Sequence, residues 1–267
     1  MSKPTGIITL TTDFGHEGPY VGVMKGVILS RLPDARIIDI SHTIQSHYPS
    51  EAGFWLARSW RYFPVGSVHV AVVDPGVGTD RSILVAKSNG HIFIAPDNGL
   101  LHPVLKDSNS TPLVYRLSEA WLKTMDWPKP SATFHGRDIF APLAAAITGS
   151  QVEPADIGPA ITNIVPSETG TPFLEGNEVS GVIIAIDRFG NLITNIDSDL
   201  LNAFRIPVVN AAGSSFRFHK TYGSCEPGEH MALVNSFGVV EISCVESNAA
   251  KALGLGHGEP VTITEAA

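Results

Sequence analysis

The sequence predicts two domains: an α/β N-terminal domain with a mostly parallel sheet and flanking helices, and an all-β, barrel-like C-terminal domain. In the first half, short apolar runs alternate with segments whose apolar residues recur at helical spacing. From residue 179 onward only strand-like runs recur. Residues 151–178 between them are rich in Pro, Gly, Thr and Glu and carry no long periodic run. We therefore expect domains at 1–165 and 175–267, joined by a linker at 166–174.

Strands and helices are expected to alternate in the first half. In chain order they are strand 6–13, helix 19–33, strand 35–41, helix 49–63, strand 67–74, strand 82–87, strand 91–96 and helix 136–149. The two runs 82–87 and 91–96 are joined by Ser88, Asn89 and Gly90, which is typical of a hairpin turn. The alternation elsewhere predicts a largely parallel sheet with both faces covered.

The second half contains seven short runs with strand character and no helical period. They are 178–187, 191–197, 205–210, 214–219, 230–236, 239–245 and 260–266. Short strands at this spacing predict a small antiparallel barrel or sandwich.

Composition excludes several classes of protein. The 267 residues are 43% hydrophobic and 16% charged, with a net charge of −8 and no run of Lys or Arg, so we expect no nucleic-acid partner. The two cysteines, Cys225 and Cys244, lack the paired spacing of a zinc site and are too few for a disulfide framework. The N-terminus has the pattern of a strand rather than a signal peptide, and no apolar run reaches the roughly 20 residues of a membrane span. We expect a cytoplasmic protein with no membrane partner.

Two strands of the first domain end in an acid beside a glycine turn. Asp13 lies in TTDFG, and Asp74 lies in DPGVG with Arg81 seven residues later; His135 lies in FHGRD before a helix. Taken alone, either Asp is explained as a turn or helix-capping residue, and His135 is explained as a packing residue. Asp74 and Arg81 together are also explained as an ion pair with a purely structural role. The recurrence favours a ligand site, because open α/β sheets bind ligands beyond the carboxyl ends of their strands.

A second group of candidates lies in the predicted barrel. Asp187, Phe189 and Asn191 occupy the turn of IDRFGNLITN, which is also explained as a hairpin turn alone. An Asn amide offers the donor and acceptor that adenine requires, and Phe189 offers a stacking face. Tyr222 in KTYG and Ser236 in NSFG repeat the pattern of a polar or aromatic residue near glycine.

Six motifs carry a family resemblance over about residues 6 to 264. TTDFG, DPGVGTDR, APDNGLL, FHGRDIFAP, IDRFGNLITNI and VNSFG occur in this order. Together they resemble the S-adenosylmethionine hydroxide adenosyltransferases, relatives of the fluorinase and chlorinase. The resemblance implies the two-domain fold above and hydrolysis of S-adenosyl-L-methionine to adenosine and L-methionine, without a metal or another cofactor. It also implies a homotrimer that binds the small-molecule substrate between the N-terminal domain of one subunit and the C-terminal domain of its neighbour.

The resemblance also implies roles for individual residues. Asp74, Arg81 and His135 would position and activate a water, Asp13 would hold the ribose diol, and Asn191 would bind adenine. A carboxylate suits the diol because it accepts from both hydroxyls.

At the other end of the ligand, Tyr222 and Ser236 would line the adenosine and methionine ends, and Asp187 would face the methionine ammonium. Glu241, on the strand after Ser236, is a further candidate.

Three departures from the halogenases favour water as the nucleophile. This chain has His135-Gly136 where those enzymes resemble a Tyr-Ser pair, and Asp74 where they carry an aromatic hydroxyl. The stretch 82–96 also lacks the long insertion of the fluorinase. The alternatives are a halogenase, a non-catalytic adenosine or S-adenosylmethionine sensor, and a metal-dependent hydrolase using Asp97 with Asp13, Asp74 and His135.

Overall fold

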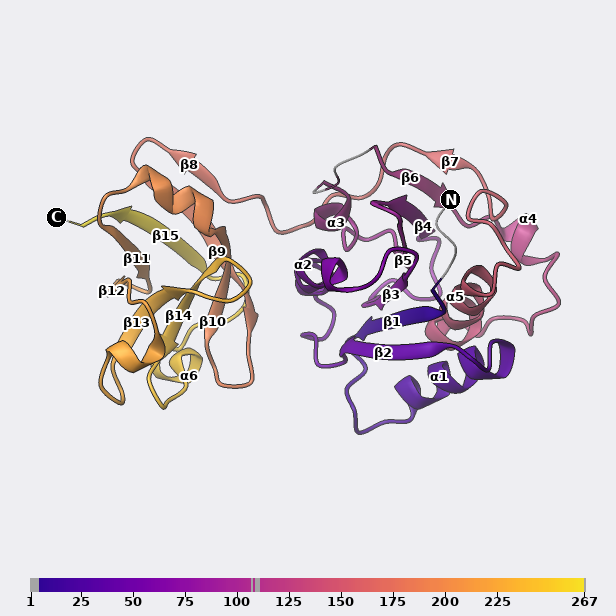
Figure 1. Ribbon diagram of the computed structural model, residues 1–267, viewed down its shortest axis with the longest axis horizontal. Helices are drawn as coiled ribbons and strands as arrows, with labels where there is room; N and C mark the ends of the chain where they lie inside the picture. The colour runs from indigo at the N-terminus through magenta and orange to yellow at the C-terminus, as the bar shows by residue number, and fades with distance from the viewer. Residues whose placement is uncertain (1–4, 107, 109–110, 267) are drawn as a thin grey trace. The chain divides into compact units, whose positions relative to one another are not determined.

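The computed structural model describes residues 5–106, 108 and 111–266 (Figure 1). The chain forms two compact units that divide between Glu168 and Thr169, within the predicted linker, and each unit is described by itself. Residues 1–4 and 267, predicted as the ends of the two domains, lie outside the described residues. The predicted domain limits of 165 and 175 stay a prediction.

Unit 1 is built on a mixed sheet with the strand order β2-β1-β3-β5-β4-β6-β7 in the described residues. The strands are β1 (Ile7–Thr12), β2 (Arg36–Ser41), β3 (Val68–Val72), β4 (Ile83–Ser88), β5 (His91–Pro96), β6 (Leu113–Arg116) and β7 (Ala160–Ile161). The pairs β1–β2, β1–β3 and β3–β5 are parallel, whereas β4–β5, β4–β6 and β6–β7 are antiparallel.

The prediction of a mostly parallel sheet is therefore only partly correct. The hairpin between β4 and β5 is as predicted, and its turn has Asn89 and Gly90 at φ angles of 51° and 78°. Two consecutive positive φ angles make a tight hairpin and reverse the chain, so β4 runs against β5. The short strands β6 and β7, which the sequence did not predict, extend the sheet from β4 in the same antiparallel sense.

Helices cover both faces of this sheet, as predicted (Figure 1). They are α1 (Tyr20–Arg31), α2 (Pro49–Ser59), the 3-10 turn η1 (Trp60–Tyr62), α3 (His102–Lys106), α4 (Glu119–Leu122), the π-helical turn η2 (Gly136–Phe140) and α5 (Ala141–Thr148). Helices α1 and α5 pack on one face through Met24, Ile28 and Leu143, and α2 and α3 pack on the other through Leu56 and Val104. The short helices α3 and α4 have no clear helical period and were not predicted.

The helix predicted at 136–149 is divided into two parts. Its first turn, η2, is π-helical, and the Ala141 amide donates to the Gly136 carbonyl. Pro142 follows and has no amide proton, so it cannot join the usual α-helical ladder. The π-helical turn η2 begins directly after His135, so it fixes the position of His135 at the N-terminal end of the helix.

Unit 2 is a nearly closed antiparallel sheet with the order β12-β11-β15-β9-β10-β14-β13, and β8 pairs with β9. Its strands are β8 (Phe173–Glu175), β9 (Glu178–Ile186), β10 (Leu192–Asp197), β11 (Pro207–Ala211), β12 (Ser214–Arg217), β13 (His230–Val234), β14 (Val239–Cys244) and β15 (Pro260–Glu265). Short helical segments are η3 (Ser198–Ala203), η4 (Tyr222–Ser224) and α6 (Ala249–Leu253). A bridge between Phe218 and Ala232 links the two ends of the sheet, which confirms the barrel-like prediction.

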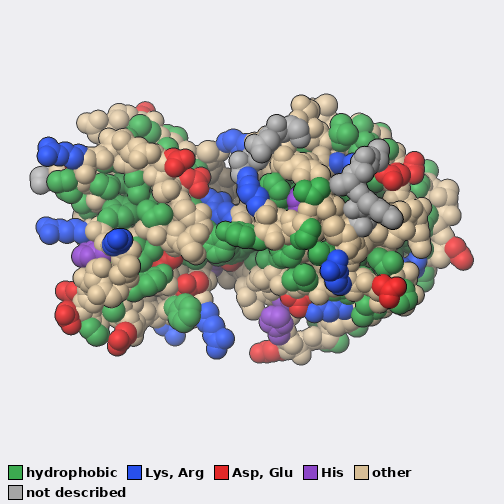
Figure 2. Space-filling view, viewed as in Figure 1, with side chains coloured by type: hydrophobic (Ala, Val, Ile, Leu, Met, Phe, Trp, Pro, Cys, Tyr) green, Lys and Arg blue, Asp and Glu red, His purple; other side chains and the backbone are tan. Residues whose placement is uncertain are grey.

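Figure 2 shows one face of the molecule, on which Lys and Arg side chains are interspersed with Asp and Glu. Both cysteines, Cys225 and Cys244, are free. Over the described part of the chain, no helix combines the length and the apolar character needed to cross a bilayer.

Candidate active site

Asp74 follows β3 at the carboxyl edge of the sheet, in the DPGVG turn. The Val77 amide donates to the Asp74 carbonyl at 3.2 Å, which closes the turn. Gly78 has a φ of +79°, and a Cβ added to it would lie 2.2 Å from the Ala132 carbonyl oxygen. Only glycine permits this approach. The turn therefore packs backbone against backbone on the segment that leads to His135.

Asp74, Arg81 and His135 contact one another directly. Arg81 Nε donates to the two Asp74 carboxylate oxygens at 3.0 and 2.9 Å, and Arg81 Nη2 donates to Asp74 Oδ2 at 2.5 Å. The same Nη2 lies 2.8 Å from His135 Nδ1. The Arg81 and Asp74 side chains are only 12% and 5% exposed, so water screens this ion pair weakly. The structure thus brings together the three residues that the sequence named; their catalytic roles stay predictions.

The contact with Arg81 determines the protonation of His135. A guanidinium has only donors, so His135 Nδ1 must accept and the ring proton must lie on Nε2. Burial, and then the positive charge of Arg81, lower the pKa of His135 below its ordinary value, which keeps the ring neutral. His135 therefore carries its ring proton on Nε2. A hydrogen bond to the Ser131 backbone and the charges of Asp74 and Asp138 oppose the lowering of its pKa.

Asp138 fixes the loop that carries His135. Its Oδ2 accepts from the Ser131 amide at 2.8 Å and the Ser131 hydroxyl at 2.7 Å, and its Oδ1 accepts from Arg137 Nε at 2.5 Å. Burial alone would raise the pKa of Asp138, but the hydrogen bonds from Arg137 and Ser131 outweigh it and lower the pKa to about 2. The residues on either side of His135 are thus held by one ionised carboxylate.

A cavity of about 410 Å³ lies beside this set and contains Asp13, Asp74 and His135 on its walls. Asp13 Oδ2 accepts from the His47 amide at 3.0 Å, and His47 has a positive φ of 61°. Within the described residues Asp13 Oδ1 accepts no hydrogen bond, so one carboxylate oxygen is available to a ligand. The volume lies in the range of small-molecule sites.

The same cavity has walls that the sequence analysis did not name. Phe14, Tyr20 and Phe134 form an aromatic cluster with ring centroids 5.3 to 6.1 Å apart. Phe14 and Phe134 are neighbours of Asp13 and His135 in TTDFG and FHGRD, so the motifs contained that signal. Tyr20 and His47 lie in no motif, so no sequence signal identified them.

A chain of polar contacts supports the TTDFG loop. The buried His42 ring lies 2.8 Å from Thr12 Oγ1 through Nδ1 and 3.0 Å from Asp39 Oδ1 through Nε2. Thr12 Oγ1 also accepts from the Phe14 amide at 3.2 Å, and the Gly15 amide donates to the His42 carbonyl at 2.7 Å. Burial lowers the pKa of His42, and Asp39 opposes the shift. His42 therefore contacts the residues that precede and follow Asp13 in the loop, Thr12 and Gly15.

In unit 2, Asp187 organises the turn between β9 and β10. Its Oδ1 accepts from the Phe189 and Asn191 amides at 2.9 Å each, and its Oδ2 accepts from Asn191 Nδ2 at 2.9 Å. Gly190 has a φ of +88°, and a Cβ there would lie 2.1 Å from the Asn248 side chain. Among the described residues, Asn191 Oδ1 and one of its amide N–H groups have no hydrogen-bond partner; the residue is 7% exposed, whereas Phe189 is 75% exposed. Asp187 thus has a clear structural role, and its contact with a methionine ammonium stays a prediction.

Glu241 joins the remaining candidates of unit 2. It is 3% exposed and accepts from the Tyr222 hydroxyl at 2.7 Å, the Ser243 hydroxyl at 2.7 Å and Asn235 Nδ2 at 3.2 Å. Burial, and then this bond to Glu241, raise the pKa of Tyr222. Ser236 is exposed in the turn that follows Asn235. Glu241 therefore acts as an anchor between the Tyr222 and Ser236 loops.

Asp97 does not join the group around Asp74. Its Oδ1 accepts from the Val165 amide at 2.8 Å. Within residues 5–106, 108 and 111–266, no three His, Cys, Asp or Glu side chains form a group able to hold a metal ion.

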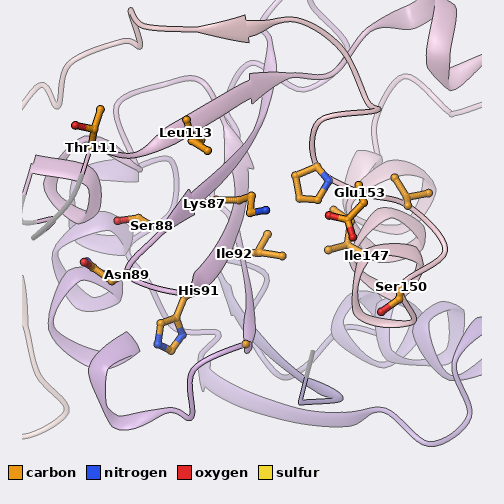
Figure 3. A pocket seen from close by; sticks show the side chains of 14 residues that line it. Lys87, Ser88, Asn89, His91, Ile92, Thr111, Leu113, Ile147, Ser150 and Glu153 are labelled. Atoms are coloured by element: carbon orange, nitrogen blue, oxygen red, sulfur yellow. The ribbon is translucent and has the colours of Figure 1, made fainter. Parts of the chain in front are cut away.

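A smaller cavity of about 290 Å³ lies at the β4–β5 hairpin, at the opposite sheet edge from Asp13 (Figure 3). Lys87 and Ile92 lie on one wall and face Glu153 and Ile147 on the other. None of the six motifs contributes to it, whereas TTDFG, DPGVGTDR and FHGRDIFAP all contribute to the Asp13 cavity, which is the candidate active site.

Comparison with family models matches both units. Residues 8–158 match the SAM hydroxide adenosyltransferase N-terminal domain, and residues 181–262 match the SAM hydroxide adenosyltransferase C-terminal domain.

Individual proteins are similar over nearly the whole chain. An (R)-S-adenosyl-L-methionine hydrolase of Methanocaldococcus jannaschii is 36% identical, over 96% of this chain and 95% of the relative. A fluorinase of Actinopolyspora mzabensis is 27% identical, over 98% of both chains. The crystal structure of an uncharacterized conserved protein from Thermotoga maritima superposes with a TM-score of 0.85 at 32% identity, covering 96% of this chain and 99% of that one.

Proposed function

The chain belongs to the SAM hydroxide adenosyltransferase family, and on this basis we propose that it hydrolyses S-adenosyl-L-methionine at ribose C5′ to give adenosine and L-methionine. Membership confirms the resemblance carried by the six motifs. The observation that carries the proposal is that Arg81 contacts both Asp74 and His135, and that these two residues line the Asp13 cavity. The similarity to hydrolases is greater than the similarity to fluorinases.

The proposed reaction is an in-line displacement. The water oxygen attacks C5′, the C5′–S bond breaks, and methionine leaves as a neutral thioether that takes the bonding electron pair. The attacking water loses one proton, so the products are adenosine, L-methionine and a proton. The sulfonium already carries a positive charge, so its departure needs no acid. The residues must therefore act on the water.

The protonation of His135 defines its part in this step. Its Nε2–H donates to the water oxygen and holds it, and the positive Arg81 stabilises negative charge that develops there. The oxygen becomes acidic as the C5′–O bond forms, so Asp74 or a second water accepts the proton. Orientation of the water toward C5′ is a major term, worth about 7 kcal/mol or more in ideal cases.

The remaining candidates bind the substrate. The available oxygen of Asp13 accepts from the ribose hydroxyls, and Asn191 and Phe189 hold adenine. Tyr222 and Ser236 line the adenosine and methionine ends, with Asp187 and Glu241 behind them as anchors. We infer that no metal or other cofactor takes part, and that the enzyme acts in the cytoplasm.

The assembly is proposed as a homotrimer in which each site combines residues of two subunits. This arrangement brings the ribose-binding Asp13 of one subunit to the adenine-binding Asn191 of its neighbour. Light scattering coupled to gel filtration measures the mass directly, and a monomer at micromolar concentration would contradict the arrangement.

The direct test is incubation of the purified protein with the separate (R) and (S) sulfonium epimers of S-adenosyl-L-methionine, followed by chromatography. Adenosine and methionine in equal amounts support the proposal, and relatives named for the (R) epimer make that epimer the expected substrate. Unchanged substrate at high enzyme would favour the sensor. A 5′-halo-adenosine formed in added chloride or fluoride would favour the halogenase, and loss of activity with a chelator would favour the metal-dependent hydrolase.

A further inference from the structure

Besides the Asp13 cavity, the Asp74, Arg81 and His135 set borders a second and larger cavity, called the second cavity below. Its volume is about 760 Å³. His135 lines both cavities, whereas Asp74 lines only the Asp13 cavity and Arg81 lines only the second one. The three residues therefore separate two openings, and anything bound in the second cavity lies against the catalytic set.

One wall of the second cavity is apolar. The end of α4 contributes Leu122, the segment after it contributes Met125 and Trp127, and η2 contributes Ile139; the first three are half-buried. Trp127 also packs edge-on against Trp121, with centroids 5.9 Å apart, and the Arg31 guanidinium lies over one face of its ring at 5.2 Å from the centroid; these two contacts hold the ring. A rigid aromatic wall in a cavity of this size suits a flat apolar molecule.

The rim of the cavity is positively charged. Arg81, Arg116, Lys123 and Lys129 line it, which is four of the eighteen Lys and Arg residues of a chain whose net charge is −8. Lys123 is paired with Glu119 at 3.6 Å, and Arg81 is paired with Asp74. In the part of the chain that the structure describes, Arg116 and Lys129 form no ion pair, and Asp80 is the remaining acid of the lining. The local balance thus favours an anion.

Arg81 lines the second cavity and keeps part of its guanidinium without a partner. Its Nε and Nη2 are engaged by Asp74 and His135, whereas Nη1 has no hydrogen-bond partner among the described residues. The side chain is only 12% exposed. A carboxylate that enters this cavity can therefore accept from the free N–H groups of the guanidinium. Such a charge-assisted hydrogen bond is stronger than one between neutral groups.

We propose that the second cavity is a binding site for a small organic anion with a flat apolar body, such as an aromatic carboxylate. The carboxylate bonds Arg81 Nη1 and is attracted by Arg116 and Lys129, and the ring lies against Trp127. Because this new acceptor competes with Asp74 and His135 for the charge of Arg81, the bound anion slows hydrolysis without occupying the Asp13 cavity. The proposed binding of the anion does not depend on the reaction that the protein catalyses, whereas the effect on rate rests on the proposed function.

Calorimetry with 2-naphthoate and its neutral analogue 2-naphthamide tests the binding. The wild type should bind one naphthoate per chain and bind the amide several-fold more weakly. Arg116→Gln with Lys129→Gln should weaken naphthoate roughly fivefold to tenfold, because two exposed charges are lost. Arg217→Gln, an exposed charge in unit 2, is the control and should change nothing. Three results would overturn the site. They are the absence of saturable binding, equal affinity for the acid and the amide, and equal affinity of the wild type and the double variant for naphthoate.

Kinetics tests the coupling. Naphthoate should lower kcat for S-adenosyl-L-methionine and leave KM unchanged, and the double variant should keep the basal kcat and lose the inhibition. A rise in KM alone would place the anion in the Asp13 cavity and overturn the proposal. If the protein hydrolyses no S-adenosyl-L-methionine, calorimetry still decides the site, so the two failures are distinguishable.

Discussion

Arg81 Nη2 donates to His135 Nδ1 across 2.8 Å, and this contact decides which nitrogen of the histidine carries the proton. The same arginine grips both oxygens of Asp74. In the proposed mechanism His135 is therefore a hydrogen-bond donor toward the reacting water, which is a narrower role than the sequence allowed.

Substitution of His135 distinguishes between its two possible roles, a hydrogen-bond donor and a general base. Gln places an amide N–H near the position of Nε2, whereas Ala leaves no donor. His135→Ala should lower kcat by about 10²–10³, the usual cost of losing one such donor. His135→Gln should retain at least tenfold more activity than His135→Ala, measured as adenosine release. Equal loss in both variants would contradict the donor role.

Acidification should inactivate the enzyme through His135. Protonation would put a hydrogen on Nδ1, facing the Arg81 donor, and break the contact. Because burial and Arg81 lower the pKa of His135, activity should be constant above the ordinary histidine pKa and fall only below it. The profile of kcat/KM between pH 4 and 8 measures this. A fall that begins above neutral pH would exclude His135 as the group responsible.

His42 should act on substrate binding through Asp13. Loss of its contact with Thr12 loosens the TTDFG loop, and one lost hydrogen bond is worth about 1 kcal/mol. His42→Ala should raise KM up to roughly tenfold with a smaller change in kcat, since the ribose is held alike before and during reaction. His16→Ala is the control, because His16 is exposed beside His42. A variant with lowered stability and an unchanged KM would assign His42 a structural role alone.

A buried histidine pair should make unit 1 sensitive to acid. His69 lies 2.9 Å from Thr9 Oγ1 and 3.0 Å from His91 Nδ1, and burial, then His91, lower its pKa to about 3. Below the unfolded value of about 6.5 the unfolded chain takes up a proton that the folded chain refuses, so stability is lost as pH falls.

Between pH 6.5 and 5 this loss amounts to about 2 kcal/mol for His69. Urea unfolding followed by tryptophan fluorescence measures it in unit 1, because all four tryptophans lie there: Trp55, Trp60, Trp121 and Trp127. His69→Gln should flatten the dependence, and His219→Gln in unit 2 should not. An unchanged slope in His69→Gln would show that another group titrates.

The sequence allowed the principal strands, the division into two units and the residues at the strand ends to be predicted. Asp74 and His135 were identified because each lies in a short motif with glycine. The β4–β5 hairpin was predicted from Ser88-Asn89-Gly90 and is confirmed. The antiparallel strands β6 and β7 were not predicted, because they are short and carry no clear alternation. His42 and Tyr20 were missed because their roles depend on contacts between distant segments, which leave no local pattern.

The most direct test of the central claim is hydrolysis of S-adenosyl-L-methionine in water enriched in ¹⁸O, with mass spectrometry of the products. Attack of water at C5′ predicts one solvent oxygen in the 5′-hydroxyl of adenosine and none in L-methionine. Adenosine that forms without label would contradict the account, because the oxygen would then come from a source other than the water held by His135 and Arg81.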